Sequence, residues 1–274
     1  MNGLISLAAV LCGMYFLLVV AQDELPTGPK NPYCVQQLCP SGKRHIACEK
    51  PPKDINKSCS IRESKVVNLT DYVESILKAH NDFRQRLANG RNMTLPRAAR
   101  MVVMQWSEEL ATLASYNVRM CKPKHDDCHN TANFKSSGQN IIMFNMTRLV
   151  DNDLMEKMYP QLITIGARTW WSEHTNSSRM MTAADVEHNP CSAIKPYQHQ
   201  PFNHFAVMAV ENNTHVGCAG LRYVAKDISY FKLTCNYAES YMCGRPIYHF
   251  RATGCTTGAN VQYKALCSKK EIFA

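Results

Sequence analysis

The sequence predicts an α+β fold with a disulfide-held segment at its N-terminus, and three observations support this prediction. Apolar residues recur at helical spacing in the first half of the chain, whereas short apolar runs between polar loops dominate the second half. Helices followed by strands indicate an α+β or layered fold rather than a parallel α/β sheet. Four cysteines are crowded into residues 34–59, a stretch without hydrophobic periodicity.

Three helices are expected between residues 70 and 173. Thr70 can cap the start and Gly90 the end of a first amphipathic helix, and Ser107 can cap a second. A third helix is expected over about 163–173, after a proline. The polar residues 176–203 contain three more prolines and are expected to be irregular.

Three strands are expected in the C-terminal half. The ranges Phe205–Val210, Val216–Tyr223 and Tyr230–Tyr237 are short apolar runs separated by polar loops. Their spacing favours an antiparallel meander. By contrast, residues 22–66 are rich in Pro, Lys and Cys, and we expect them to be irregular and held by disulfides rather than by a core.

The first residues follow the pattern of a secretory leader. Leu4–Val20 is mostly apolar and uncharged, and Val19 and Ala21 place small residues before a cut at Gln22. A membrane anchor is the alternative, because the run is about long enough to span a bilayer. The pattern favours cleavage, so we predict a secreted, extracellular protein with no transmembrane anchor once the signal peptide is removed.

The cysteine count agrees with export. The chain has 13 cysteines, and Cys12 falls inside the leader, which leaves an even number. An even set in an exported chain indicates a disulfide framework, whose connectivity the sequence alone leaves open. A cytosolic metal cluster is the alternative, but no Cys-x-x-Cys pair occurs. Sequons for N-glycosylation begin at Asn56, Asn68, Asn92, Asn145, Asn176 and Asn212.

The net charge of +9 is spread along the chain. Lys43, Arg44 and His45 form one short basic cluster, and aromatic residues do not alternate with basic ones as they do in nucleic-acid-binding segments. We therefore expect no nucleic-acid partner and interpret the charge as solvated surface, compatible with anionic partners.

Four sets of motif segments carry a family resemblance. They are Cys121–Thr131 (CKPKHDDCHNT) with Ser137–Asn140 (SGQN), Trp170–Glu173 (WWSE), Asn203–Ala206 (NHFA) leading to Cys218, and Cys235–Tyr237 (CNY) with Gly244–Tyr248 (GRPIY). Together they resemble the CAP superfamily, which includes cysteine-rich secretory proteins, antigen 5 and pathogenesis-related 1 proteins. The cysteines of residues 34–59 resemble the insect antigen-5 (venom allergen 5) branch, and the tail over 254–267 is similar to that of fly members.

This resemblance implies a three-layer α-β-α sandwich. With the leader, it divides the chain into a signal peptide (1–21), a disulfide-rich N-terminal segment (22–66), a CAP domain (67–250) and a short disulfide-closed tail (251–274). It implies the disulfides Cys34–Cys48, Cys39–Cys128, Cys59–Cys121, Cys218–Cys235 and Cys255–Cys267, with Cys191–Cys243 as the remaining pair.

In the family, two histidines and two acidic residues line a central cleft. The matching histidines are His125 and His204, one acid is Glu173, and Gln139 holds the other acidic position. Two imidazoles can bind zinc or another divalent ion weakly, with Glu173 as a third ligand or as an acceptor for an imidazole N–H, although no cofactor is required. In the alternative interpretation, His125, Glu173 and His204 hydrogen-bond to one another and hold the cleft together.

Catalysis has little support in the sequence. No nucleophile–base pair, His-Glu-x-x-His or Gly-x-Ser-x-Gly motif is recognisable, and Gln139 cannot act as a general base. Where relatives carry Tyr-Thr-Gln and then Trp, this chain has Phe205-Ala206-Val207 and Val210. These changes predict either a drier or remodelled cleft wall or residues that simply pack the sheet. We therefore expect no enzymatic activity.

The sequence thus favours a non-enzymatic extracellular binding or signalling protein of the antigen-5 type, with an extracellular protein or receptor as partner. The similarity to fly members favours a seminal-fluid protein acting in reproduction and the post-mating response. One alternative is a carrier of a small lipid or sterol, with apolar residues among 141–165 lining the groove. The other is a metal-dependent hydrolase built on His125, Glu173 and His204.

Overall fold

The computed structural model describes residues 31–48, 52–57, 59, 61–91, 94–175, 180–188 and 202–273. The predicted signal peptide, the sequon residues Asn92 and Asn176, and Cys191 lie outside these ranges. None of the helices within the ranges is long and apolar enough to cross a membrane.

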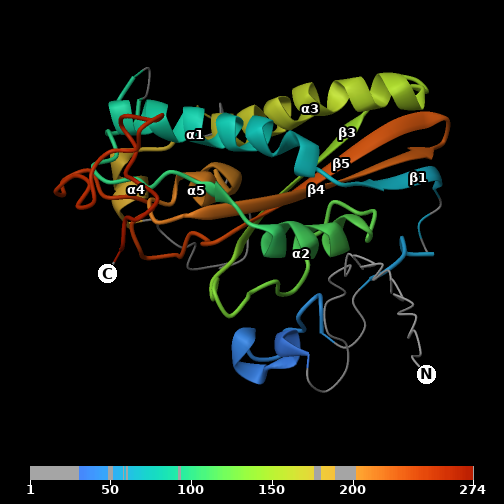
Figure 1. Ribbon diagram of the computed structural model, residues 1–274, viewed down its shortest axis with the longest axis horizontal. Coiled ribbons are helices and arrows are strands. Elements are labelled where there is room, and N and C mark those ends of the chain that lie inside the picture. The colour runs from blue at the N-terminus through green and yellow to red at the C-terminus, as the bar shows by residue number, and fades with distance from the viewer. Residues whose placement is uncertain are drawn as a thin grey trace, which may run out of the picture.

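One mainly antiparallel sheet forms the centre of the fold (Figure 1). Its strands follow the order β1-β4-β5-β3, and β2 pairs in parallel with β4. The β4–β5 hairpin supplies the two central strands, which leaves β3 at an edge of the sheet. The strands are β1 (Arg62–Val67), β2 (Gln105–Trp106), β3 (Gly138–Asn145), β4 (His215–Ala225) and β5 (Ile228–Tyr237).

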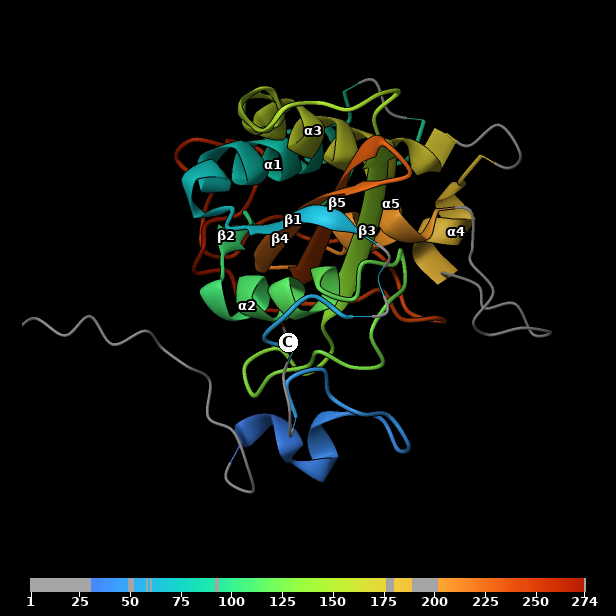
Figure 2. The same cartoon turned by 90° about the vertical axis from the view of Figure 1, so that its right-hand side faces the viewer.

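Helices cover both faces of this sheet, so the predicted α-β-α sandwich is confirmed (Figure 2). α1 and α3 pack side by side on one face, α2 covers β4 and β5 on the other, and α5 lies beside β3. The helices are α1 (Val73–Asn89), α2 (Glu108–Val118), α3 (Asn152–Ser172), α4 (Ala183–His188) and α5 (Asn203–Ala209).

Strand β5 is buried on both faces, which determines where the polar chemistry of the fold lies. Successive strand residues point to opposite faces. Its polar residues Lys232, Thr234 and Asn236 face α2 and are buried there. Buried polar groups need internal partners, and Asn117 of α2 provides one, since its Oδ1 accepts from Lys232 Nζ at 2.9 Å and Thr234 Oγ1 at 3.0 Å. The apolar residues that alternate with them join the core under α1 and α3: Phe231, Leu233, Cys235 and Tyr237.

Residues 31–48, which are part of the predicted N-terminal segment (22–66), lie beyond α2 and are held mainly by disulfides (Figure 2). The Tyr33 hydroxyl donates to Glu109 of α2 at 3.0 Å, which adds a polar link to the domain. The disulfides formed are the same pairs that the resemblance implies: Cys34–Cys48, Cys39–Cys128, Cys59–Cys121, Cys218–Cys235 and Cys255–Cys267. The exposed Cys243 pairs with no described cysteine, and the predicted Cys191–Cys243 bond falls outside the described residues.

Several secondary-structure predictions were wrong. Phe205–Val210 was predicted as a strand, but most of it lies in helix α5. A short apolar run buried on all sides has no periodicity that separates a strand from a helix. The third helix, α3, begins at Asn152 and includes Pro160, which is exposed, so the hydrogen bond that proline cannot donate is missing on the solvent side.

Two further elements lie in stretches predicted to be irregular. Strand β1 carries charged, exposed residues at the edge of the sheet, so it lacks the alternating pattern of a half-buried strand. Helix α4 lies within 176–203 and has only two buried residues, Asp185 and Val186. Such short elements depend on tertiary contacts rather than on local propensity.

One buried carboxylate, that of Glu271, joins two parts of the C-terminal tail to each other and to Arg100. Glu271 accepts hydrogen bonds from the backbone N–H groups of Thr256 and Thr257, both at 2.9 Å, and from both hydroxyls. It also pairs with Arg100, and its side chain is fully buried. Burial would raise the pKa of Glu271, but the hydrogen bonds from Thr257, Thr256 and Arg100 hold this pKa at about 2.

Replacing Glu271→Gln is expected to lower the free energy of unfolding by about 2 kcal/mol at pH 7, because hydrogen bonds to a charged acceptor are lost. The pKa of Glu271 is lower in the folded state than in the unfolded chain, so its stabilisation is present above about pH 4.5 and fades as the pH falls towards 2. Urea unfolding at pH 7 and pH 3 measures this: the difference between wild type and variant should shrink at pH 3. The control Glu156→Gln affects only an exposed ion pair with Lys65 and should change little.

Candidate functional site

The site lies where the edge strand β3 begins, and two neighbouring residues of that strand organise it. Gln139 and Asn140 are both buried, and because strand residues alternate, their side chains point to opposite faces of the sheet. Gln139 Oε1 lies 2.8 Å from His125 Nδ1 on the α2 side. Asn140 Nδ2 donates to the backbone carbonyl of His204 at 3.1 Å on the other side. The two histidines are therefore held from opposite faces of one strand.

His125 belongs to the loop over residues 121–131, which follows α2. The residue as a whole is exposed to solvent, while its Nδ1 lies against Gln139. Burial is the first cause that lowers the pKa of His125, and the nearby His204 imidazole lowers it further, whereas the hydrogen bond to Gln139 raises it. The contribution of His204 to this pKa places its imidazole near His125.

Glu173 and His204 form a second pair, which joins the end of α3 to the start of α5. Glu173 opens a short 3-10 helix (Glu173–Thr175) directly after α3. Its Oε1 lies 2.6 Å from His204 Nδ1, and its Oε2 accepts the backbone N–H groups of His204 at 2.9 Å and Phe205 at 3.3 Å. Trp170 stacks on the His204 ring, with the ring centroids 6.4 Å apart. Glu173 thus caps α5 and orients its histidine at the same time.

Both histidines use the same ring nitrogen, Nδ1, for their hydrogen bond within the protein. The Gln139 and Glu173 oxygens can only accept, so each must receive the Nδ1–H of its histidine. In the neutral imidazole, Nε2 then carries the lone pair that can bind a metal ion. An acceptor behind a ligating histidine is the arrangement that orients imidazoles in metal sites.

The described residues provide no cluster of three or more His, Cys, Asp or Glu side chains that could surround a metal ion. His125 and His204 therefore fit a cation as two imidazole ligands, with water or a partner group completing its coordination. Glu173 is engaged with His204 and two backbone N–H groups, which suits an orienting role better than direct ligation. Such a two-ligand site binds weakly compared with sites that supply three protein ligands.

Comparisons with known proteins agree with this architecture. The sequence profile described as the cysteine-rich secretory protein family, CAP, matches residues 77–237. Venom allergen-1 of Aedes albopictus is 34% identical over 245 residues, which cover 87% of this chain and 88% of the relative. The chain belongs to the CAP family. Venom allergen 5 of Vespula maculifrons is 26% identical and covers 83% of this chain and 92% of its own length, so the antigen-5 relationship is confirmed.

Solved structures share the CAP fold at low sequence identity. BmVAL-1 superposes with a TM-score of 0.56 at 20% identity, covering 74% of this chain and 96% of its own. NaASP2 with Zn²⁺ superposes with a TM-score of 0.54 at 19% identity, covering 73% of this chain and 96% of its own. Membership in a family of secreted proteins, with relatives named as venom allergens, is consistent with an extracellular protein.

The structure brings the predicted CAP cleft residues together in two pairs. Glu173 bonds to His204 as one interpretation expected, but His125 bonds to Gln139 instead of joining them. Val207 and Val210, predicted to lie on a cleft-side strand, are buried in or directly after α5. A Cβ atom at Gly138 would lie 2.9 Å from Val207 Cγ1, so Val207 packs tightly against the start of β3.

The sequence interpretation missed the polar groups behind this CAP cleft. Asp126 accepts from Gln139 Nε2 at 2.7 Å and Asn117 Nδ2 at 2.9 Å, and pairs with His129 at 2.6 Å. Burial would raise the pKa of Asp126, but His129, Gln139 and Asn117 hold this pKa well below its usual range. Burial also lowers the pKa of Lys232 to about 8. The sequence held one sign of a buried polar network: Lys232, Thr234 and Asn236 alternate with apolar residues in the run 231–237.

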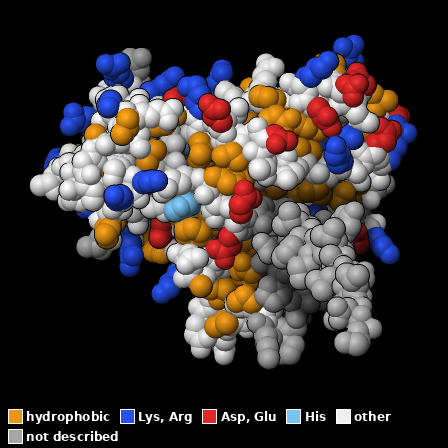
Figure 3. Space-filling model, in the orientation of Figure 1, with side chains coloured by type: hydrophobic (Ala, Val, Ile, Leu, Met, Phe, Trp, Pro, Cys, Tyr) orange, Lys and Arg blue, Asp and Glu red, His pale blue; other side chains and the backbone are white. Residues whose placement is uncertain are grey.

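The surface of this CAP protein shows no single-sign face in the view of Figure 3, where Lys and Arg are scattered among Asp and Glu. This distribution agrees with a solvated charge excess. The described sequon residues Asn56, Asn68 and Asn145 are exposed, and Asn212 is half-buried. Their side chains can therefore be reached by glycosylation enzymes, although use of the sequons stays a prediction.

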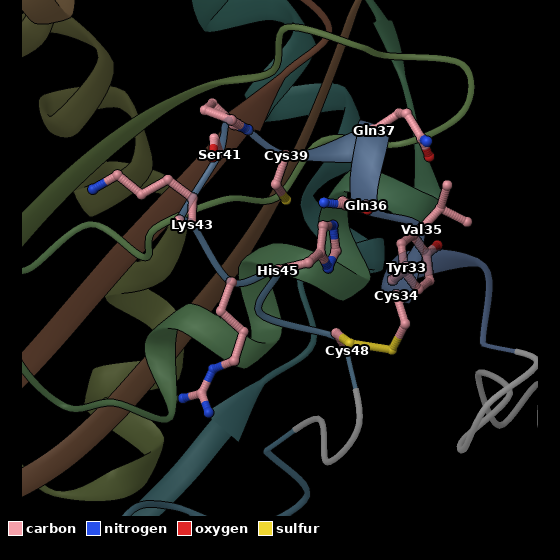
Figure 4. A pocket seen from close by; sticks show the side chains of 13 residues that line it. Tyr33, Cys34, Val35, Gln36, Gln37, Cys39, Ser41, Lys43, His45 and Cys48 are labelled. Atoms are coloured by element: carbon pink, nitrogen blue, oxygen red, sulfur yellow. A yellow bond between two sulfur atoms is a disulfide. The ribbon is translucent and has the colours of Figure 1, made fainter.

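A separate pocket of about 550 Å³ is formed by the N-terminal segment alone (Figure 4). Tyr33 stacks on His45 with ring centroids 4.8 Å apart, and His45 Nε2 lies 2.7 Å from the Asn130 carbonyl. Lys43 points away from the other labelled side chains. The segment also bonds Ile46 N–H to the Cys128 carbonyl at 2.9 Å. These contacts anchor the loop that carries His125 to a disulfide-linked support.

Proposed function

We propose that this CAP protein is a secreted, non-enzymatic extracellular binding protein of the antigen-5 type, whose cleft binds a divalent cation through His125 and His204. The arrangement of the two imidazoles carries this proposal. Each has its Nδ1 engaged by an acceptor, which leaves the Nε2 lone pair of the neutral ring for a cation. A cation held by two protein ligands keeps open positions that carbonyl or carboxylate groups of a partner can fill.

Zinc is the first ion to test, because imidazole suits zinc and NaASP2 was crystallised with Zn²⁺. We expect titration calorimetry to detect one zinc ion per wild-type chain, and either His125→Ala or His204→Ala to weaken binding at least about tenfold. The control His249→Ala removes an exposed histidine that pairs with Glu211 at 2.6 Å, outside the cleft. Unchanged zinc affinity in both cleft variants would contradict the proposal.

The biological setting proposed for this binding protein is the seminal fluid, acting in reproduction and the post-mating response through an extracellular protein or receptor. The similarity of its tail to fly members supports this setting. Immunodetection in male glands and in the ejaculate tests it directly. Absence from both tissues would rule out the reproductive role and leave the cation site unaffected.

A lipid carrier is a second candidate, supported only by one stacked aromatic pair in a pocket that polar and charged side chains otherwise line. The pocket, about 730 Å³, lies at the C-terminal ends of α1 and α3. Phe83 and Trp171 stack there with centroids 5.3 Å apart, and Arg86 lies over Phe83. Among the apolar residues expected to line a groove, Ile142 and Phe144 instead pack against the hydrophobic core. Mass spectrometry of natively purified protein should then find a lipid that Trp171→Ala releases; an empty wild-type protein would exclude the carrier.

A metal-dependent hydrolase remains the alternative that uses the same residues. The described cleft combines imidazoles with the carboxylate of Glu173, but Glu173 is occupied by His204 and α5. Hydrolysis that persists unchanged in a His125→Ala/His204→Ala double variant would exclude this site as its source.

A further inference from the structure

Behind the cleft, a chain of buried amides connects two charged side chains. Asp126 stands at one end and can only accept hydrogen bonds, whereas the ammonium of Lys232 stands at the other end and can only donate. Asn117 and Gln139 lie between them. Each amide has a donating and an accepting end, so the two charges determine which way each amide must face.

The orientation of Asn117 follows from Lys232. Lys232 Nζ donates to both the backbone carbonyl and the side-chain Oδ1 of Asn117, each at 2.9 Å. Thr234 Oγ1 donates to the same Oδ1 at 3.0 Å. With its oxygen engaged there, Asn117 directs Nδ2 to Asp126 Oδ2 at 2.9 Å and to the Lys124 carbonyl at 3.1 Å.

The orientation of Gln139 follows from Asp126. Gln139 Nε2 donates to Asp126 Oδ2 at 2.7 Å and to Asn236 Oδ1 at 2.9 Å. Asn236 is oriented in turn, because its own Nδ2 donates to the Leu110 carbonyl at 3.3 Å. A reversed Gln139 amide would place Oε1 against two acceptor oxygens and lose both bonds. Gln139 Oε1 is therefore directed to His125 Nδ1, 2.8 Å away.

We propose that Asp126 and Lys232 are positioning residues that orient the Asn117 and Gln139 amides and thereby hold His125 in the Nδ1–H tautomer. His125 Nε2 then keeps its lone pair in the cleft. Lys232 acts without touching the histidine, through Asn117 and Asp126. The tautomer follows from the hydrogen-bond directions alone, whereas its use in holding a cation rests on the proposed function.

The tautomer of His125 can be read without any cation, from ¹⁵N chemical shifts of the imidazole nitrogens in ¹⁵N-histidine-labelled protein. His125→Gln assigns the signals. In wild-type protein, the neutral His125 ring is expected as a single Nδ1–H form. Asp126→Ala and Lys232→Met are each expected to convert this single form into a mixture with the Nε2–H form. The matched control Asp127→Ala removes the neighbouring carboxylate, which is exposed, and should leave the tautomer unchanged.

The wild-type spectrum can overturn the proposal even if a variant fails to fold. A neutral wild-type His125 found as the Nε2–H form overturns it. A folded Lys232→Met protein that keeps a pure Nδ1–H form also overturns it, because the buried ammonium then plays no part in orienting His125.

Zinc titration of the same proteins tests the cation site of the proposed function separately from the hydrogen-bond relay, by which we mean the chain from Lys232 through Asn117, Asp126 and Gln139 to His125. If zinc binds, Asp126→Ala is expected to weaken it about 10- to 100-fold, the range typical for residues that orient a metal ligand. If wild type shows the Nδ1–H form but binds no zinc, the proposed function fails and the relay stands. If zinc binds and the wild-type tautomer is Nε2–H, the relay fails and the cation site stands.

Discussion

Replacing Gly217→Ala is expected to lower the free energy of unfolding by about 3–5 kcal/mol and to reduce secretion sharply. Gly217 lies in β4 where α2 crosses the sheet. A Cβ atom there would lie 2.2 Å from Ala111 N, 2.4 Å from Ser107 O and 2.7 Å from Leu110 C. All three are backbone atoms of the first turn of α2 and the residue that caps it, so no side-chain rotation can relieve the clash.

The displacement of α2 should also disturb the buried polar residues of β5, because α2 carries their partner Asn117. The measurement is urea unfolding together with the yield of secreted protein. Gly254→Ala is the matched control, since the nearest atom to its added methyl group would be Ala99 O at 3.8 Å. The control should stay within about 0.5 kcal/mol of wild type. A Gly217→Ala protein as stable as this control would show that α2 does not approach β4 so closely.

Replacing Arg84→Met is expected to cost about 3–5 kcal/mol, because it leaves several buried carbonyl groups without donors. The Arg84 guanidinium is fully buried and donates five hydrogen bonds to four backbone carbonyls. Those carbonyls belong to Val102, Met208, Val210 and Glu211, at distances of 2.8–3.2 Å. The side chain thus connects α1 to the segment before β2 and to the turn after α5.

Thermal unfolding of Arg84→Met, Arg84→Lys and Arg168→Met tests this role. Lysine offers three donors on one nitrogen and cannot reach carbonyls on both sides, so Arg84→Lys should recover only part of the loss. Arg168 is exposed on α3, and its replacement should change stability by less than about 0.5 kcal/mol. If Arg84→Met unfolds at the same temperature as Arg168→Met, water must replace the guanidinium at these carbonyls.

Local sequence signals predicted the fold where a single element carries them. Ser107 caps α2 through a bond from Leu110 N at 3.3 Å, as its residue type indicates. Gly90 ends α1 with a φ of 67°, a conformation that favours glycine. By contrast, α5 and β1 depend on neighbours: Glu173 holds the first N–H groups of α5, and β4 pairs with β1.

The sequence likewise predicted which residues form the candidate site, but not how they pair. By resemblance to the family, the motif segments predicted that His125, Gln139, Glu173 and His204 share one cleft. Their pairing was not predictable, because the direction of each side chain depends on which strand face it occupies. In the sequence, Gln139 stands where the family has an acidic residue, yet in the structure it joins Asp126 to His125.

The sequence by itself indicated the family, the disulfide pairs that the family resemblance implies, and two helix ends, at Ser107 and Gly90. The predicted cap Thr70 was wrong, because Thr70 lies in a short 3-10 helix (Thr70–Tyr72) that precedes α1. Export stays a prediction. Only the tertiary structure decided that the polar side of β5 is covered. Alternation of Lys232, Thr234 and Asn236 with apolar residues is typical of a strand with one face in water. Helix α2 instead covers that face, and buried polar groups must then find partners within the protein. The resulting network, through Asn117 and Asp126, is what directs Gln139 to His125.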